Sequence, residues 1–155
     1  MRLVVAVVGK ARNPALGEAI RDYETRAARY WPLDVHEVRE ERAAGKTSIE
    51  IVKDKEGDRL AERIPGGAHT VVCEQGGRPL DSSQFADFLR RARDEDRDLA
   101  FVIGGAFGLA TNLSSRAATK LSLAPWTLPH EIARLVLAEQ IYRAGTIVRG
   151  EPYHK

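Results

Sequence analysis

The feature that most constrains the fold is a run of six apolar residues, Leu3 to Val8, close to the N-terminus. A strand with one side in water alternates polar and apolar residues, whereas a strand covered on both faces is apolar throughout. The run therefore predicts a buried strand of a parallel sheet, over Arg2 to Val8. It is too short to span a membrane or to form a signal-peptide core, and Lys10 and Arg12 follow it. We therefore expect a cytosolic protein.

Strand and helix patterns alternate along the rest of the chain, which predicts a single α/β domain over residues 1–155 with a mostly parallel sheet flanked by helices. The further strands are expected at Leu33 to Val38, His69 to Cys73, Leu99 to Ile103 and Lys120 to Leu123. The helices are expected at residues 14–30, 47–63, 82–95, 114–118 and 130–148, with a polar tail from Arg149 to Lys155.

Helix starts and turns have their own signals. Asn13 precedes Pro14, an N-cap followed by a favoured first helical residue. Thr47 with Glu50 fits a capping box, and either Asp81 or Ser82 caps the next helix. The glycine-rich stretch from Gln75 to Pro79 is expected to be a turn, and Arg39 to Lys46 a loop.

Composition excludes some classes of protein. The single cysteine, Cys73, rules out an internal disulfide framework and a multi-cysteine zinc site, and the histidine spacing indicates no metal centre. The net charge is only +2, but residues 100–155 carry six basic and three acidic side chains. A positive field in the C-terminal third permits an anionic partner there without requiring one.

The helix expected at residues 130–148 is apolar over more than one stripe. A surface helix of a small monomer has one polar face. This helix is therefore either enclosed in the core or packed against a second subunit, and we expect it to form the interface of a homodimer.

Three loops leave predicted strands at their carboxyl ends, where ligands bind in open α/β sheets. They are Cys73 to Gly77, Gly104 to Gly108, and Ala124 to Pro129. The second loop is neither a dinucleotide fingerprint nor a P-loop. Gly104 and Gly105 either turn a tight corner or let the backbone cradle a nucleotide-like ligand.

Several single residues have both a structural and a functional interpretation. His130 is either a solvated histidine at a helix start or a functional imidazole. Arg134 and Arg143 are either surface charges or phosphate ligands. Trp126 is more typical of a core residue than of a platform for stacking a ligand. Cys73 is typical of a small apolar side chain at the end of a buried strand. Tyr153 and His154 lie where chain ends commonly fray.

A set of motifs over nearly the whole chain resembles one family, the ribosomal large subunit methyltransferase H family of the SPOUT class. The order of the motifs and their ending at Tyr-His-Lys make the resemblance specific. The motifs are Asp54-Lys-Glu-Gly57, Phe101-Val-Ile-Gly-Gly105, Gly108-Leu109, Leu121-Ser-Leu123, Thr127-Leu-Pro-His130, Arg134, Glu139-Gln-Ile-Tyr-Arg-Ala144 and Tyr153-His154-Lys155.

The resemblance implies a homodimer with a C-terminal trefoil knot, although unknotted connections are the general expectation. It also implies that S-adenosylmethionine is the methyl donor. The implied reaction methylates N3 of a pseudouridine in helix 69 of 23S rRNA on the assembled 70S ribosome, with no DNA or membrane partner. The implied cofactor-binding residues are Cys73, Gly105, Ala124, Pro125, Trp126, Thr127, Leu128 and Pro129.

For the transfer itself, the enzyme must align N3 with the methyl group and assist loss of the N3 proton. His154, from the tail of the partner subunit, or His130 is the expected base. Tyr153 would position the ring, and Arg134 or Arg143 would meet phosphate or a developing oxyanion. Two rival functions remain open: a nucleotide-binding dimer without catalysis, and a ribosome-binding assembly factor without transfer activity.

Overall fold

The computed structural model describes residues 1–43, 45 and 48–154. Within that part of the chain, five parallel strands form one sheet in the order β2-β1-β4-β3-β5. β1 is buried over its whole length, which confirms the prediction of a buried strand. The strands are β1 (Leu3–Val8), β2 (Leu33–Val38), β3 (His69–Pro79), β4 (Leu99–Ile103) and β5 (Thr119–Ser122).

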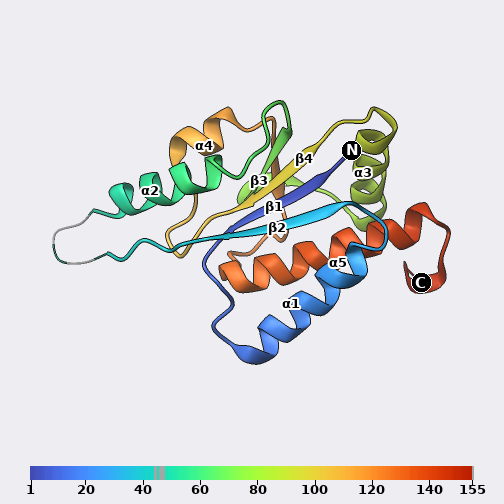
Figure 1. Ribbon diagram of the computed structural model, residues 1–155, viewed down its shortest axis with the longest axis horizontal. Helices are drawn as coiled ribbons and strands as arrows, with labels where there is room; N and C mark the ends of the chain where they lie inside the picture. The colour runs from blue at the N-terminus through green and yellow to red at the C-terminus, as the bar shows by residue number, and fades with distance from the viewer. Residues whose placement is uncertain (44, 46–47, 155) are drawn as a thin grey trace.

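Helices cover both faces of the sheet, so the fold has three layers (Figure 1). On one face, α1 (Pro14–Ala27), α3 (Ser82–Asp94) and α5 (His130–Val148) enclose the larger core, which includes Trp31 and Phe101. On the other face, α2 (Ile49–Ala61) and α4 (Thr111–Arg116) cover a smaller core. The chain closes with a short 3-10 helix, η1 (Pro152–His154). No helix among the described residues is long and apolar enough to cross a membrane.

α5 lies between α1 and α3 and against the sheet. Leu137, Ile141 and Ala144 are fully buried there. The burial of α5 on several sides explains much of why its sequence is apolar over more than one stripe. Along the same helix Ile132, Leu135 and Val136 are only half-buried, so part of the apolar surface remains available.

The helix caps follow the predictions except in α2. The Asn13 side chain accepts hydrogen bonds from the backbone N–H groups of Ala15 and Leu16, at 2.9 and 3.3 Å. Asp81, rather than Ser82, caps α3 and forms a capping box with Gln84. The cap of α2 is Ser48, not Thr47, because the Ser48 hydroxyl accepts from the N–H of Ile51. Thr47 itself lies outside the described residues.

Several element boundaries differ from the predictions. α1 ends at Ala27 instead of near residue 30, because the N–H groups of Tyr30 and Trp31 both bond to the Ala27 carbonyl in a tightened last turn. α2 and α3 also end one or two residues early. α4 starts at Thr111, three residues before the predicted start, and β5 begins and ends one residue early.

The turn predicted from Gln75 to Pro79 is wrong, because this stretch belongs to β3. β3 pairs with β5 through Cys73 opposite Leu121, and the pairing resumes with Arg78 opposite the same Leu121. The residues between them form an irregularity in the ladder, and the strand continues past it. Glycines that suggested a chain reversal therefore mark a bulge instead, and this bulge faces the candidate site.

Candidate functional site

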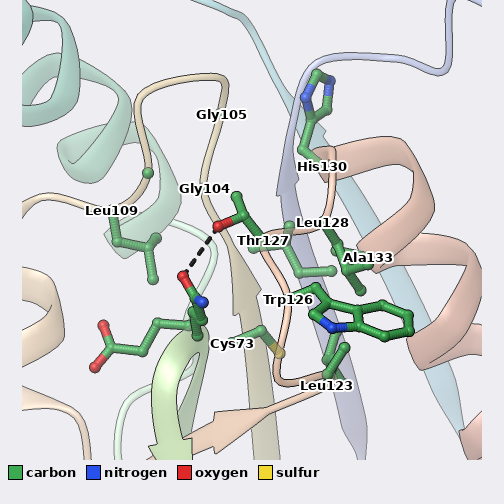
Figure 2. Close-up of a pocket in the computed structure, with 15 residues that line it drawn as sticks. Cys73, Gly104, Gly105, Leu109, Leu123, Trp126, Thr127, Leu128, His130 and Ala133 are labelled. Carbon is green, nitrogen blue, oxygen red and sulfur yellow. Dashed lines mark hydrogen bonds between the residues drawn. The ribbon is translucent and has the colours of Figure 1, made fainter.

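A cavity of about 190 Å³ opens at the carboxyl ends of β4 and β5, beside the bulge in the middle of β3. All three loops predicted to bind a ligand contribute to its walls, as Figure 2 shows. Of the predicted cofactor-binding residues, six line the cavity: Cys73, Gly105, Ala124, Trp126, Thr127 and Leu128. Pro125 and Pro129 belong to the same segment but are not lining residues, and His130 completes the wall at the start of α5.

One side chain from the β3 bulge fixes the 124–129 segment. The Gln75 side-chain amide donates to the carbonyl of Pro125 at 3.0 Å, and its oxygen accepts from the Thr127 hydroxyl at 2.9 Å. The second of these bonds is the dashed line in Figure 2. Because both partners of Gln75 flank Trp126, this single amide sets the path of the segment across the cavity. Sequence reasoning missed Gln75, since it placed the residue in a turn.

Trp126 is not a core residue. Its side chain is 76% exposed, so the expectation that it packs in the core is wrong. The reason is that Gln75 holds the backbone on either side of Trp126, and the indole is left at the mouth of the cavity.

Gly105 lies against a buried acid of α2. A Cβ on Gly105 would come within 2.7 Å of Glu56 Oε2 and 3.1 Å of a Val8 methyl group, so a side chain there would displace the loop. Glu56 is 4% exposed, and its Oε2 has no hydrogen-bond partner among the described residues. Its other oxygen accepts from the N–H of Glu41 at 3.0 Å. Burial raises the pKa of Glu56, an effect reinforced by the neighbouring Glu40.

The Cys73 thiol points toward the cavity in Figure 2. Burial raises the pKa of this thiol to about 12, so it is a neutral group at physiological pH. This state suits a packing contact and not a nucleophile. Among the described residues, no three His, Cys, Asp or Glu side chains are grouped so as to hold a metal ion.

Arg134 follows the cavity-lining Ala133 on α5, and its side chain is buried against α1 and β2. Its guanidinium bonds to Glu24 at 2.8 Å and 3.2 Å and to Glu37 at 2.6 Å. Burial alone would lower the pKa of Arg134, but the bonds to the two carboxylates outweigh it and the net direction is upward. This arrangement ties α5 to α1 and the sheet, and it leaves the cation already neutralised.

The tail residues gather at the other end of α5. Arg143 bonds to Glu139 at 2.6 and 2.9 Å and lies over the Tyr153 ring. The Tyr153 hydroxyl donates to Glu139 at 3.2 Å and lies 3.4 Å from that of Tyr23. Burial, with these neighbours, raises the pKa of Tyr153. His154 ends η1. The structure thus brings Arg143 and Tyr153 together, but not with the cavity of the same chain.

Comparison with known proteins adds to this geometry. A family profile described as "Predicted SPOUT methyltransferase" matches residues 1–154. A protein of Gemmatimonas aurantiaca named "Ribosomal RNA large subunit methyltransferase H" is 56% identical over 155 residues, covering 100% of both chains. Proteins with the same name from Syntrophotalea carbinolica and Bacillus pumilus are 40% and 38% identical, covering 99% and 100% of both chains. The chain belongs to the ribosomal RNA large subunit methyltransferase H family.

Membership of this SPOUT family confirms the resemblance drawn from motifs over nearly the whole chain. Glu40 and Glu56 lie in the N-terminal half. Sequence reasoning missed both acids as neighbours of the site, because they come from the segment after β2 and from α2 and lie outside the three recognised loops. The only signal for either was the Asp54-Lys-Glu-Gly57 motif.

Proposed function

We propose that this protein methylates N3 of a pseudouridine in helix 69 of 23S rRNA, on the assembled 70S ribosome, with S-adenosylmethionine as the methyl donor. The observation that carries the proposal is the cavity at the carboxyl ends of β4 and β5 and the bulge of β3, built from the three segments that the family resemblance implies as the donor site. The names of the relatives supply the RNA substrate class.

The cavity suits a nucleoside. Leu109, Leu123 and Leu128 offer apolar walls, and the backbone of the 124–129 segment offers polar groups along one side. Gly105 has no side chain to intrude, and none could be added without striking Glu56. When bound, S-adenosylmethionine supplies a methyl group that its sulfonium has already activated. The protein's task is then orientation and control of the acceptor's proton.

We assign the role of base to His130, because it is the histidine that lines the cavity among the residues the structure describes. Its imidazole would take the weakly acidic proton from N3 as the new bond forms. His154 is the alternative base, and it would have to come from a second copy of the chain. Arg143 and Tyr153 would also act on the partner's site. Arg134 holds α5 against α1 and β2 through its bonds to Glu24 and Glu37.

The geometry of one protomer supports a homodimer. Tyr153 contacts Glu139 and Tyr142, nine and twelve residues beyond His130 on α5, which is about 14–18 Å along a helix axis. The tail therefore lies far from the cavity of its own chain. The half-buried Ile132, Leu135 and Val136 offer an apolar face for the second subunit. A sedimentation mass of one chain at micromolar concentration would contradict the dimer.

The trefoil knot and a cytoplasmic location remain parts of the same proposal. The support for the knot is membership of the SPOUT family, whose resemblance implies it. The 124–129 segment, which leads from β5 at the sheet edge to α5, is the part of the chain whose path decides it. An experimental structure that traces the segment relative to the Gly104 to Gly108 loop tests the knot.

The first experiment is transfer of labelled methyl from S-adenosylmethionine to 70S ribosomes that lack the modification, with separated 50S subunits as the control. Label in 23S rRNA of the 70S sample alone is the expected result. Binding of the donor without transfer would instead favour a non-catalytic dimer, and ribosome binding without the donor an assembly factor.

Mixing two inactive variants tests the exchange of tails. We expect His130→Ala and His154→Ala each to lower turnover by about a hundredfold or more, with donor affinity kept in the latter. If the tail serves the partner's cavity, mixed dimers contain one intact site and regain activity. No recovery after subunit exchange would place the tail and the cavity in one protomer.

A further inference from the structure

A carboxylate lies behind the imidazole at the cavity. Glu40, in the segment that follows β2, has its Oε1 3.9 Å from Nε2 of His130. Nε2 is buried and has no hydrogen-bond partner among the described residues. The His130 side chain as a whole is 23% exposed. One ring nitrogen is therefore turned toward Glu40, and Nδ1 is left for another partner.

The fold holds Glu40 in this place from two sides. Gly9 ends β1 with φ +78°, and a Cβ there would collide with Glu40 Oε1, so only glycine lets the carboxylate approach this closely. The Arg12 guanidinium bonds to the other oxygen, Oε2. The Arg12 N–H also donates to Glu131 Oε1 at 2.7 Å, which joins the same loop to the first turn of α5. Loops after β1 and β2 thus converge on the start of α5.

We propose that Glu40 is a positioning residue that orients His130 for proton transfer, an inference that rests on the proposed function. Nε2–H donates to Glu40 Oε1, which fixes the tautomer with a lone pair on Nδ1. Nδ1 accepts the proton from N3 as the N3–methyl bond forms and the methyl–sulfur bond breaks. The positive charge that appears on the imidazole lies beside a carboxylate. The gap of 3.9 Å closes on substrate binding, since such contacts are commonly long in free enzymes.

Other charged groups lie at this edge. Arg12, in the loop after β1, bonds to Glu40 through its guanidinium and to Glu131 of α5 through its backbone N–H. Glu56, on α2, lies across Gly105 and is near Glu40. Glu41 faces the opposite way and bonds to Arg59 and Lys55. It is the matched control, because it is the same residue type one position along the chain but does not contact His130.

The test compares Glu40→Gln with Glu41→Gln in the full-length protein. In the ligand-free state, nitrogen-15 NMR of the His130 ring shows which ring nitrogen carries the proton. We expect the tautomer with the proton on Nε2 to predominate in the parent and in E41Q, and its share to fall in E40Q. An unchanged share of this tautomer in all three proteins would overturn the proposal.

Activity provides the second measurement. E40Q should lower kcat by about tenfold or more, with unchanged donor affinity, and Glu40→Asp should restore part of the rate. Equal losses in E40Q and E41Q, or a changed tautomer with an undiminished rate, would also overturn the positioning role. A failure of the proposed function can be distinguished from a failure of this inference. Full activity of His130→Gln would show that His130 is not the base. An inactive His130→Gln protein together with a fully active E40Q protein would instead refute only the role of Glu40.

Discussion

Replacing Gln75 with alanine separates binding of the donor from stability of the fold. The Gln75 amide makes two hydrogen bonds, at 3.0 Å to Pro125 and 2.9 Å to Thr127, and it is exposed. Each such bond contributes about 0.5–1.5 kcal/mol net. Their loss frees the 124–129 segment, and a bound nucleoside must then order it again. We expect the affinity for S-adenosylmethionine to fall by about fivefold to thirtyfold, which corresponds to about 1–2 kcal/mol.

Calorimetry of donor binding, together with thermal unfolding, measures this effect. The melting temperature should change little, because the lost bonds connect surface segments and bury no apolar area. Gln140→Ala is the matched control, since Gln140 bonds to Ser82 and Glu139 on the side of α5 away from the cavity. An unchanged affinity in the folded Gln75→Ala protein, or an equal fall in the control, would refute the idea that this amide sets the binding segment.

Three further predictions concern buried groups. With its pKa raised to about 12, Cys73 should resist iodoacetamide at about pH 8 in the native protein and react in denaturant, as mass spectrometry would show. Burial raises the pKa of Glu56, so the folded protein is most stable when this carboxyl is protonated, and that stability is lost as pH rises through the folded-state pKa. Glu56→Gln should therefore raise the melting temperature near pH 8 and have little effect near pH 4. Arg134→Ala leaves the carboxylates of Glu24 and Glu37 without their shared cation and should lower the free energy of unfolding in urea by about 3 kcal/mol. A decrease of less than about 1 kcal/mol would show that these ion pairs have no structural role.

Elements that depend on local chemistry were predictable from the sequence. The apolar run of β4 gave the bounds of that strand, and the run of β1 gave its bounds to within one residue. The pair Asn13–Pro14 marked the start of α1. Pro129 and the polar residues after Val148 bounded α5 correctly. In each case the deciding interaction lies within a few residues of the signal, so no knowledge of the tertiary structure was needed.

Features that depend on distant partners were not predictable. Gly76 and Gly77 suggest a turn, but pairing with β5, some 45 residues away, carries β3 through to Pro79. Trp126 resembles a core residue until its neighbours are seen to be held by Gln75. Apolar character alone does not decide burial, because backbone tethers elsewhere can hold a large side chain in water.

The positions of His130 and Tyr153 at the two ends of α5 explain why one chain contains the cavity but does not bring the tail residues to it. His130 begins the helix at the cavity, whereas Tyr153 packs on Tyr142 near its far end. Since the helix is rigid, no rearrangement of the short tail brings Tyr153 to the His130 of the same protomer. If the tail takes part in transfer, the complete site must belong to two chains. The sequence of the tail can then mark residues of the reaction without indicating which cavity they serve.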